Sequence, residues 1–217
     1  MFDIKIFNEY ESFFYKNHES SYELIEGSGP VMISAPHSVE QTRNGKKKYA
    51  EPQTGALAKL LHDSLNCPVI YKTSNCGDDA NFDDESTYKD AIVDYVKKHG
   101  VRFVLDLHQL ASFRDVTIDI GTGKFKNIDS IKYVNIVLRA FSCRDIGIIQ
   151  IDTPFDASSP FTISSYVAKK CGICCLQLEI NSNAVNSKRE NSEVGKVFDA
   201  LSETIVMISK SLTQKEI

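Results

Sequence analysis

Two histidines and two glutamates lie where predicted strands or helices meet loops, and their residue types suit one kind of chemistry. They are His37, Glu51, His108 and Glu179. Imidazole is a common metal ligand, and two imidazoles with one carboxylate form a known catalytic zinc set that leaves one coordination position open. A second carboxylate can then take a proton from water while the metal polarises a carbonyl. These residue types together suit the hydrolysis of an amide bond.

The spacing of these residues is not that of a local metal-binding motif. A sequence such as His-Glu-x-x-His places two ligands on one face of a helix, whereas His37, Glu51 and His108 are far apart in the chain. Only the fold can bring them together. Residue types and positions therefore leave two interpretations open, a metal site and ordinary polar residues at strand ends.

Residues 102–109, Arg-Phe-Val-Leu-Asp-Leu-His-Gln, must position His108. The short apolar run after Gly100 predicts a buried strand of an α/β sheet. Asp106 and His108 are two residues apart, so on a strand their side chains point to the same side, near its carboxyl end. Open α/β sheets bind their ligands at that end, and an aspartate nearby can orient an imidazole.

His37 and Glu51 flank a basic segment. His37 follows the apolar run 31–35, which predicts a strand, and the polar, basic residues 40–50 predict a loop. Pro52 and the leucine stripe after it predict a helix, which places Glu51 near a helix amino terminus. The three lysines at 46–48 are interpreted first as part of a solvated loop, with attraction of an anionic substrate as the alternative.

Glu179 lies in the apolar run 173–180, which predicts a central strand. A carboxylate among buried apolar residues costs free energy unless it is paired or belongs to a site. Glu179 is therefore the most informative residue after His108. Cys171, Cys174 and Cys175 resemble a Cys-x-x-Cys motif, but we interpret them as small structural residues because two of them lie in this same strand.

The rest of the sequence predicts alternating strands and helices. Further strands are expected at 68–71, 116–120 and 147–151, and further helices at 88–99, 131–141, 161–171 and 194–208. Residues 1–25 predict only an amino-terminal arm or an edge strand. The acidic segment 73–85 is expected to be a plain loop, or one that orders an arginine or closes over a pocket. We therefore expect one three-layer α/β/α domain over residues 1–217, with a mixed, mainly parallel sheet.

Length, charge and composition narrow the class of protein. The chain has 217 residues, of which 42% are hydrophobic, and its net charge is -4 with both signs mixed along the sequence. This size suits one good core, and the charge pattern argues against a nucleic-acid partner. No apolar run reaches the ~20 residues that cross a bilayer, and no basic segment precedes an apolar one at the amino terminus, so we expect a cytoplasmic protein without a membrane partner. The six cysteines are expected to be mostly reduced.

Three segments, in this order, resemble the N-formylglutamate amidohydrolase family, which is related in fold to the zinc carboxypeptidases. They are Ser-Ala-Pro-His-Ser-Val-Glu-Gln-Thr-Arg-Asn-Gly-Lys-Lys-Lys-Tyr-Ala-Glu at 34–51, Asp-Leu-His at 106–108 and Gln-Leu-Glu-Ile at 177–180. The similarity spans residues 31–181. Pro-His alone is unspecific, whereas the ordered combination is more specific. The resemblance implies the α/β/α fold of the zinc carboxypeptidase and phosphorylase/hydrolase type.

The resemblance also implies a zinc ion held by His37, Glu51 and His108, with Glu179 as the general base. Glu40 is the alternative third ligand, because the carboxypeptidase pattern places its glutamate three residues after the first histidine. The choice between Glu51 and Glu40 stays open at this point, as does the choice between zinc and another divalent ion.

The family further implies arginines that hold a substrate carboxylate. Arg43 and Arg114 are the candidates, because a guanidinium can bind a carboxylate through two parallel hydrogen bonds. Either arginine could instead stabilise the developing oxyanion. A small molecule or short peptide with a carboxylate is thus the expected substrate.

Three functions remain possible from the sequence. The leading one is a zinc-dependent amidohydrolase that acts on a small N-acyl amino acid resembling N-formylglutamate. The second is a zinc peptidase that cleaves γ-linked polyglutamate or cell-wall peptides, for which the lysines at 46–48 would help to bind a polyanion. The third is a metal-free ligand-binding domain on the same fold, which both histidines together with Glu179 argue against.

Overall fold

A seven-stranded mixed sheet forms the centre of the described chain, which comprises residues 2–16, 18–190 and 192–214 of a computed structural model. Its strands are β1 (Tyr22–Ile25), β2 (Val31–Ala35), β5 (Val69–Lys72), β6 (Phe103–Leu110), β7 (Ile118–Gly121), β8 (Ile149–Ile151) and β9 (Cys174–Asn181). They lie in the order β1-β5-β2-β6-β9-β7-β8. The four strands β5, β2, β6 and β9 are parallel, and the other three run in the opposite direction. The predicted mixed, mainly parallel sheet is confirmed.

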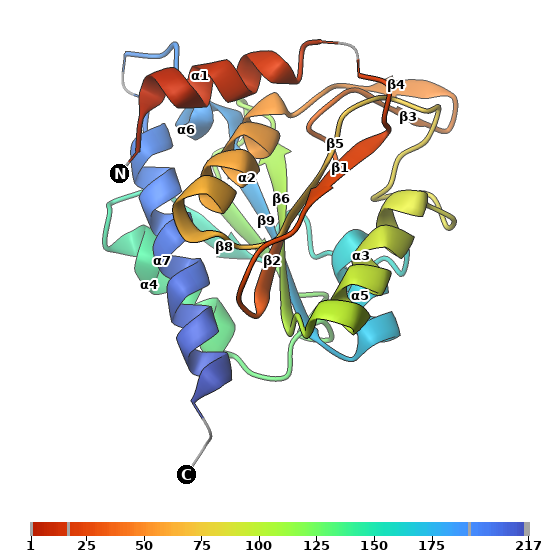
Figure 1. The fold of residues 1–217 in the computed structure, drawn as a ribbon. Helices are drawn as coiled ribbons and strands as arrows, with labels where there is room; N and C mark the ends of the chain where they lie inside the picture. Colours follow the sequence, from red (N-terminus) through yellow and green to blue (C-terminus); the bar gives the residue numbers. More distant parts are fainter. Residues whose placement is uncertain (1, 17, 191, 215–217) are drawn as a thin grey trace.

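Helices cover both faces of this sheet (Figure 1). On one face lie α2 (Pro52–Leu65), α4 (Lys132–Ser142) and α7 (Val194–Thr213), and on the other lie α3 (Thr87–His99) and α5 (Ile163–Cys171). The short helix α6 (Ser182–Val185) follows β9. The predicted three-layer architecture is confirmed. Among the described residues, no helix combines the length and the apolar character that crossing a membrane requires.

The two faces of the central strands differ in polarity. On the α2/α4/α7 face, β6 presents apolar side chains from Phe103 to Leu107, and β9 presents them from Cys174 to Ile180. On the α3/α5 face, Val104 and Cys175 near the amino ends are apolar and buried, but the next positions toward the carboxyl ends are polar. These are Asp106 and His108 on β6, paired in register with Gln177 and Glu179 on β9. Side chains alternate across a strand, so this change of polarity builds a polar site on one face without disturbing the core on the other.

Two elements differ from the sequence-based expectation. Residues 40–50, predicted to be a loop, instead contain a hairpin of β3 (Gln41–Arg43) and β4 (Lys46–Lys48). Asn44 and Gly45 both have positive φ, which suits a two-residue hairpin turn with an Asn-Gly sequence. At the amino terminus, β1 is the expected edge strand, but α1 (Ile4–Phe13) precedes it and packs against α2. The Asp3 side chain caps α1 by accepting hydrogen bonds from the backbone amides of Lys5 and Ile6.

The turn that carries His37 is held by a hydrogen-bonded serine and by close packing against α2. The Ser38 hydroxyl shares its one proton between the backbone carbonyl of Lys72, at 2.6 Å, and that of Ala35, at 3.0 Å, which fixes the exit of the chain from β2. A Cβ at Gly55 on α2 would lie only 2.6 Å from the Cβ of Ser38. The absence of a side chain at Gly55 therefore lets α2 approach this turn closely, and with it Glu51 at the start of the helix.

Candidate metal centre

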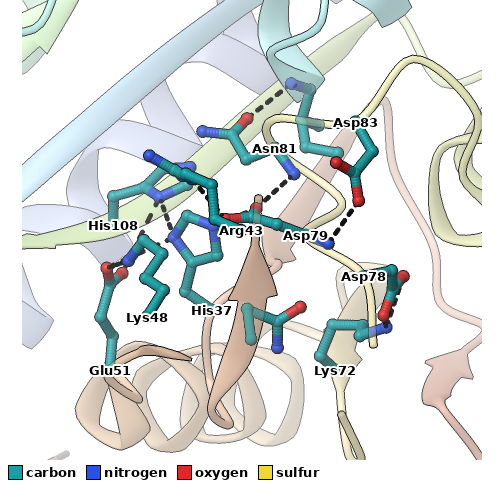
Figure 2. A network of polar contacts seen from close by, with 12 residues as sticks. His37, Arg43, Lys48, Glu51, Lys72, Asp78, Asp79, Asn81, Asp83 and His108 are labelled. Carbon is teal, nitrogen blue, oxygen red and sulfur yellow. Dashed lines mark hydrogen bonds and ion pairs between the residues drawn. The ribbon is translucent and has the colours of Figure 1, made fainter. Parts of the chain in front are cut away.

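His37, Glu51 and His108 converge at the carboxyl end of the sheet (Figure 2). His37 comes from the turn after β2, Glu51 from the residue before α2, and His108 from β6. The Nδ1 atoms of the two histidines are 3.0 Å apart, and Glu51 places Oε1 3.3 Å from Nδ1 of His37 and Oε2 3.8 Å from Nδ1 of His108. All three residues are buried. One nitrogen from each histidine and the carboxylate thus face the same point.

The other nitrogen of each histidine is bound by a fully buried aspartate. Nε2 of His37 lies 2.9 Å from Asp79 Oδ1, and Nε2 of His108 lies 2.9 Å from Asp106 Oδ2. A carboxylate accepts a proton in a hydrogen bond, so each aspartate favours the tautomer with the proton on Nε2. Both Nδ1 atoms are then left with a lone pair, as in the carboxylate–histidine–metal arrangement of many proteins.

Two lone pairs that face each other at 3.0 Å repel unless a positive charge lies between them. Burial lowers the pKa of His108, but the surrounding carboxylates, Asp106 above all, outweigh burial and raise the pKa to about 9. In the metal-free protein, His108 therefore carries an extra proton near neutral pH. Since a divalent cation would satisfy the same nitrogen and carboxylate atoms, the donor set fits a metal ion.

Glu51 is held in place by both its backbone and its side chain. Its amide donates a 2.7 Å hydrogen bond to the carbonyl of His37, and Oε2 accepts a 3.0 Å hydrogen bond from the amide of Gln109. Lys48 Nζ lies 2.5 Å from Oε1. Although burial opposes ionisation, His37 and Lys48 outweigh it and lower the pKa of Glu51 to about 2. Glu51 is thus a permanent carboxylate, the form that binds metals.

Glu179 approaches the same centre from β9. It is paired in register with His108 on one side and with Asp119 of β7 on the other. The Gln177 side-chain amide donates a 3.0 Å hydrogen bond to its Oε1. Burial raises the pKa of Glu179 to about 7, an effect that the positive charge of His108 only partly offsets. A carboxylate with this pKa can accept and return a proton near neutrality.

The two candidate arginines differ in their partners. Arg43 Nε lies 2.8 Å from Asp79 Oδ2, and its guanidinium lies over the ring of Phe82. Arg114 is half-buried and lies between the rings of Phe113 and Phe155, with its Cζ 5.6 Å and 5.0 Å from their centroids. Among the described residues, Arg114 has no ion-pair partner. Its hydrogen-bond donors are therefore available to a ligand, whereas Arg43 already binds one carboxylate.

One cavity of about 500 Å³ joins the three predicted metal ligands, the predicted base and the two candidate arginines. Its lining includes the two histidines, Glu51, Glu179, Arg43 and Arg114, and one wall is formed by residues 154–159. The buried Asp119 holds this wall, because its carboxylate accepts hydrogen bonds from the amides of Thr153 and Phe155. A cavity of this size can enclose a small ligand.

Glu40, the alternative ligand, lies elsewhere. Its carboxylate forms an exposed ion pair with Lys47 and lines a different cavity, beside the residues that follow α1. The hairpin explains the difference. It carries the chain away after Glu40 and returns it at Glu51, which then pairs with the backbone of His37.

Several residues near the centre were not singled out as site residues by their sequence positions. Asp79 was considered only as part of the acidic loop, yet it binds both His37 and Arg43, and Asn81 lines the cavity beside it. Asp79 lies 42 positions after His37, so no local spacing reveals the contact. Gln177 could have been found, because it lies two residues before Glu179 and so shares its face of the strand.

Two further histidines and the cysteines have structural surroundings. His62 hydrogen-bonds to the carbonyl of Cys67, and the exposed His99 stacks on Tyr95. All six cysteines are free thiols. Cys174 and Cys175 are buried in β9, and burial raises the pKa of both, which keeps them in the unreactive thiol form.

No protein-family model matches the sequence, and no curated protein matches it either. Solved structures with a similar fold include a bacteriophage poly-γ-glutamate hydrolase, with 13% identity, coverage of 92% of this chain and 94% of that chain, and a TM-score of 0.56. An N-formylglutamate amidohydrolase from Ralstonia eutropha has 11% identity, 88% and 98% coverage, and a TM-score of 0.52. A metallo-carboxypeptidase from Burkholderia cenocepacia has 14% identity, 97% and 68% coverage, and a TM-score of 0.50. At these identities the similarity confirms the fold class, that of the carboxypeptidase-like α/β/α proteins.

Proposed function

We propose that this protein is a metal-dependent hydrolase of an amide bond. The observation that carries the proposal is the convergence of His37 Nδ1, His108 Nδ1 and the Glu51 carboxylate, with both Nε2 atoms bound by buried aspartates. Burying a charged group costs free energy unless the group is paired with another charge or binds a ligand. The names of the three similar structures, all hydrolases, support the reaction class.

His37, Glu51 and His108 would hold the metal, and zinc suits a site of two imidazoles and one carboxylate. A zinc ion there would supply a Lewis acid that polarises the amide carbonyl and lowers the pKa of water. Asp79 and Asp106 would hold the imidazole rings in the ligating orientation.

Glu179 would move the protons of the reaction. It lies in the same cavity as the three ligands and is oriented by the hydrogen bond from Gln177. Burial raises the pKa of this carboxylate in the metal-free protein. In the metal-loaded enzyme it would take a proton from the attacking water and then give that proton to the leaving amine. Because Glu179 is not needed to hold the metal, its role is separable from that of Glu51.

Arg114 would bind a carboxylate of the substrate. Its guanidinium packs against the rings of Phe113 and Phe155 and can form two parallel hydrogen bonds with a carboxylate. Arg43 would act indirectly, by holding Asp79 against His37. The substrate is then an amide that carries a carboxylate, and an N-acyl amino acid such as N-formylglutamate is a small example.

The experiment is an amine-release assay on N-formyl and N-acetyl amino acids, with zinc and with a chelator. We expect release that zinc supports and the chelator stops, and a preference for substrates with a free carboxylate over their amides. His108→Ala should abolish release, whereas His99→Ala, a matched change at an exposed histidine, should not. Release that the chelator leaves unchanged would contradict the proposal, and the metal-free binding domain would replace it if no substrate were cleaved and no zinc were bound.

A further inference from the structure

A second cavity of about 670 Å³ adjoins the candidate metal centre. The two cavities share part of their lining, which consists of Arg43, Lys48, Glu51, Gln109 and Ala111. They are therefore adjacent parts of one groove, which runs from Arg114 past Glu51 to the β3–β4 hairpin. A single N-acyl amino acid fits within the first cavity and leaves the second without a role.

The second cavity is positively charged on its hairpin side. Arg43 and the three lysines of β4 line it, and Glu51 is its single acidic lining residue among the described residues. This clustering contrasts with the net charge of -4 for the whole chain. A groove lined by one sign of charge attracts ligands of the opposite sign.

The three lysines of the hairpin differ in whether they already form ion pairs within the protein. Lys46 is exposed and forms no ion pair with any described residue. Lys47 pairs with Glu40 on the surface, where both side chains are exposed and solvent weakens the interaction. Lys48 lies against Glu51 at the junction of the two cavities. Lys46 is therefore available to bind an anionic group at the outer end of the groove, and Lys47 can do so by exchanging its exposed partner Glu40 for the ligand.

The shape and charge of this groove indicate what class of substrate the site accepts. This inference rests on the proposed amide hydrolysis. We infer that the second cavity binds a chain of acidic amino acids joined by amide bonds, with its outer carboxylates on Lys46 and Lys47 while one amide bond reaches the metal centre. Such a ligand has a carboxylate on every residue and so offers charge along the groove as well as to Arg114. The substrate would then be an acidic peptide rather than a single acylated amino acid.

The test uses the full chain with Glu179→Gln, so that the probe is not consumed. Fluorescein-labelled oligoglutamates, α-linked and γ-linked, are titrated and followed by fluorescence anisotropy. Lys46→Gln with Lys47→Gln should weaken binding of at least one oligomer by about tenfold and reduce its dependence on salt. Lys97→Gln with Lys98→Gln, which removes the same charge from the exposed end of α3, should leave the affinity within about twofold.

Two results would overturn the inference, namely equal affinity in the hairpin variant and the parent, or an equal loss in the α3 control. Neither depends on turnover, so the failure of the groove can be told apart from the failure of the proposed function. Amine release from N-acyl amino acids without binding of the oligomers would reject the inference about the second cavity and leave the proposed function standing. Oligomer binding that the hairpin lysines support, in a chain that takes up no zinc and cleaves no amide, supports the groove and rejects the proposed function.

Discussion

Glu51 and Glu179 are equally buried, at 7% and 8% exposure, and both lie next to His108, yet their surroundings give them opposite acidities. Burial raises the pKa of either carboxyl group. Around Glu51, His37, Lys48 and His108 outweigh burial and bring the pKa to about 2. Around Glu179, burial wins and the pKa is about 7.

The difference shows how one small site can contain both a ligand and a base. A metal ligand must stay ionised, whereas a general base must exchange its proton near the working pH. Environments that separate the pKa values of two neighbouring carboxyl groups assign them to different tasks. We therefore expect substitutions at the two glutamates to have different consequences.

The largest effect is expected for Glu179→Gln. This change keeps the shape of the side chain and removes its ability to take a proton, so kcat should fall by about a hundred- to ten-thousand-fold. The zinc content should not change. Steady-state amine release measures the effect, with Glu85→Gln at an exposed position as the control. Activity equal to that of the parent would remove Glu179 from the mechanism.

The same substitution should stabilise the metal-free protein at high pH. The pKa of Glu179 rises from the ordinary 4.5 to about 7 on folding, so the native state binds more protons between these values. The stability due to this carboxyl group is fully present below pH 4.5 and is lost as pH rises through 7. Relative to the parent, Glu179→Gln should gain up to about 3 kcal/mol in the free energy of unfolding above that pH.

Urea unfolding of both metal-free proteins at pH 5 and pH 8 measures this change. A gain at pH 8 that is much smaller at pH 5 is expected. A loss of stability at pH 8 would show that the ionised carboxylate of Glu179 is well paired, and the contrast with Glu51 would then fail.

The aspartates behind the histidines should affect metal affinity next most strongly. Asp106→Asn keeps a hydrogen-bond acceptor for Nε2 of His108 but removes the negative charge, and Asp79→Asn does the same at His37. Each should weaken zinc binding by about ten- to a hundredfold. Competition with a chromophoric chelator measures the dissociation constants. Asp94→Asn, at an exposed position on α3, is the control that should not change them.

The smallest effect concerns substrate binding and separates the two arginines. Arg114→Gln should raise KM for a substrate with a carboxylate by about tenfold, and should change KM little for the matching amide. Arg139→Gln, an exposed arginine on α4, serves as the control. Arg43→Gln should lower zinc affinity instead, because Arg43 holds Asp79. A rise in KM with Arg43→Gln and a loss of zinc affinity with Arg114→Gln would instead assign binding of the substrate carboxylate to Arg43.

Local patterns predicted the main elements of the fold well. Strands β6 and β9 are marked by short apolar runs, and the start of α2 is marked by Pro52. These are local signals that can be read from neighbouring residues in the sequence. The hairpin was missed although Asn44-Gly45 is a strong turn signal, because its strands are short and polar. Helix α1 was missed because a short helix depends on tertiary packing for its stability, and its partner α2 lies far along the chain.

The candidate site could be predicted less fully than the fold. Residue types and strand positions pointed to the two histidines and Glu179, since buried polar residues stand out in apolar runs. The preference for Glu51 over Glu40 could not be reached from spacing, because it depends on the return of the chain after the hairpin. Nor could the contact between Asp79 and His37 be found, because a loop and a turn meet there only in the folded chain.

The most direct test of the different tasks of Glu51 and Glu179 is the zinc content of three proteins purified identically and measured by inductively coupled plasma mass spectrometry. We expect about one zinc per chain in the parent and in Glu179→Gln, and almost none in Glu51→Gln. Full zinc in Glu51→Gln, or its loss in Glu179→Gln, would contradict the assignment of Glu51 as ligand and Glu179 as base.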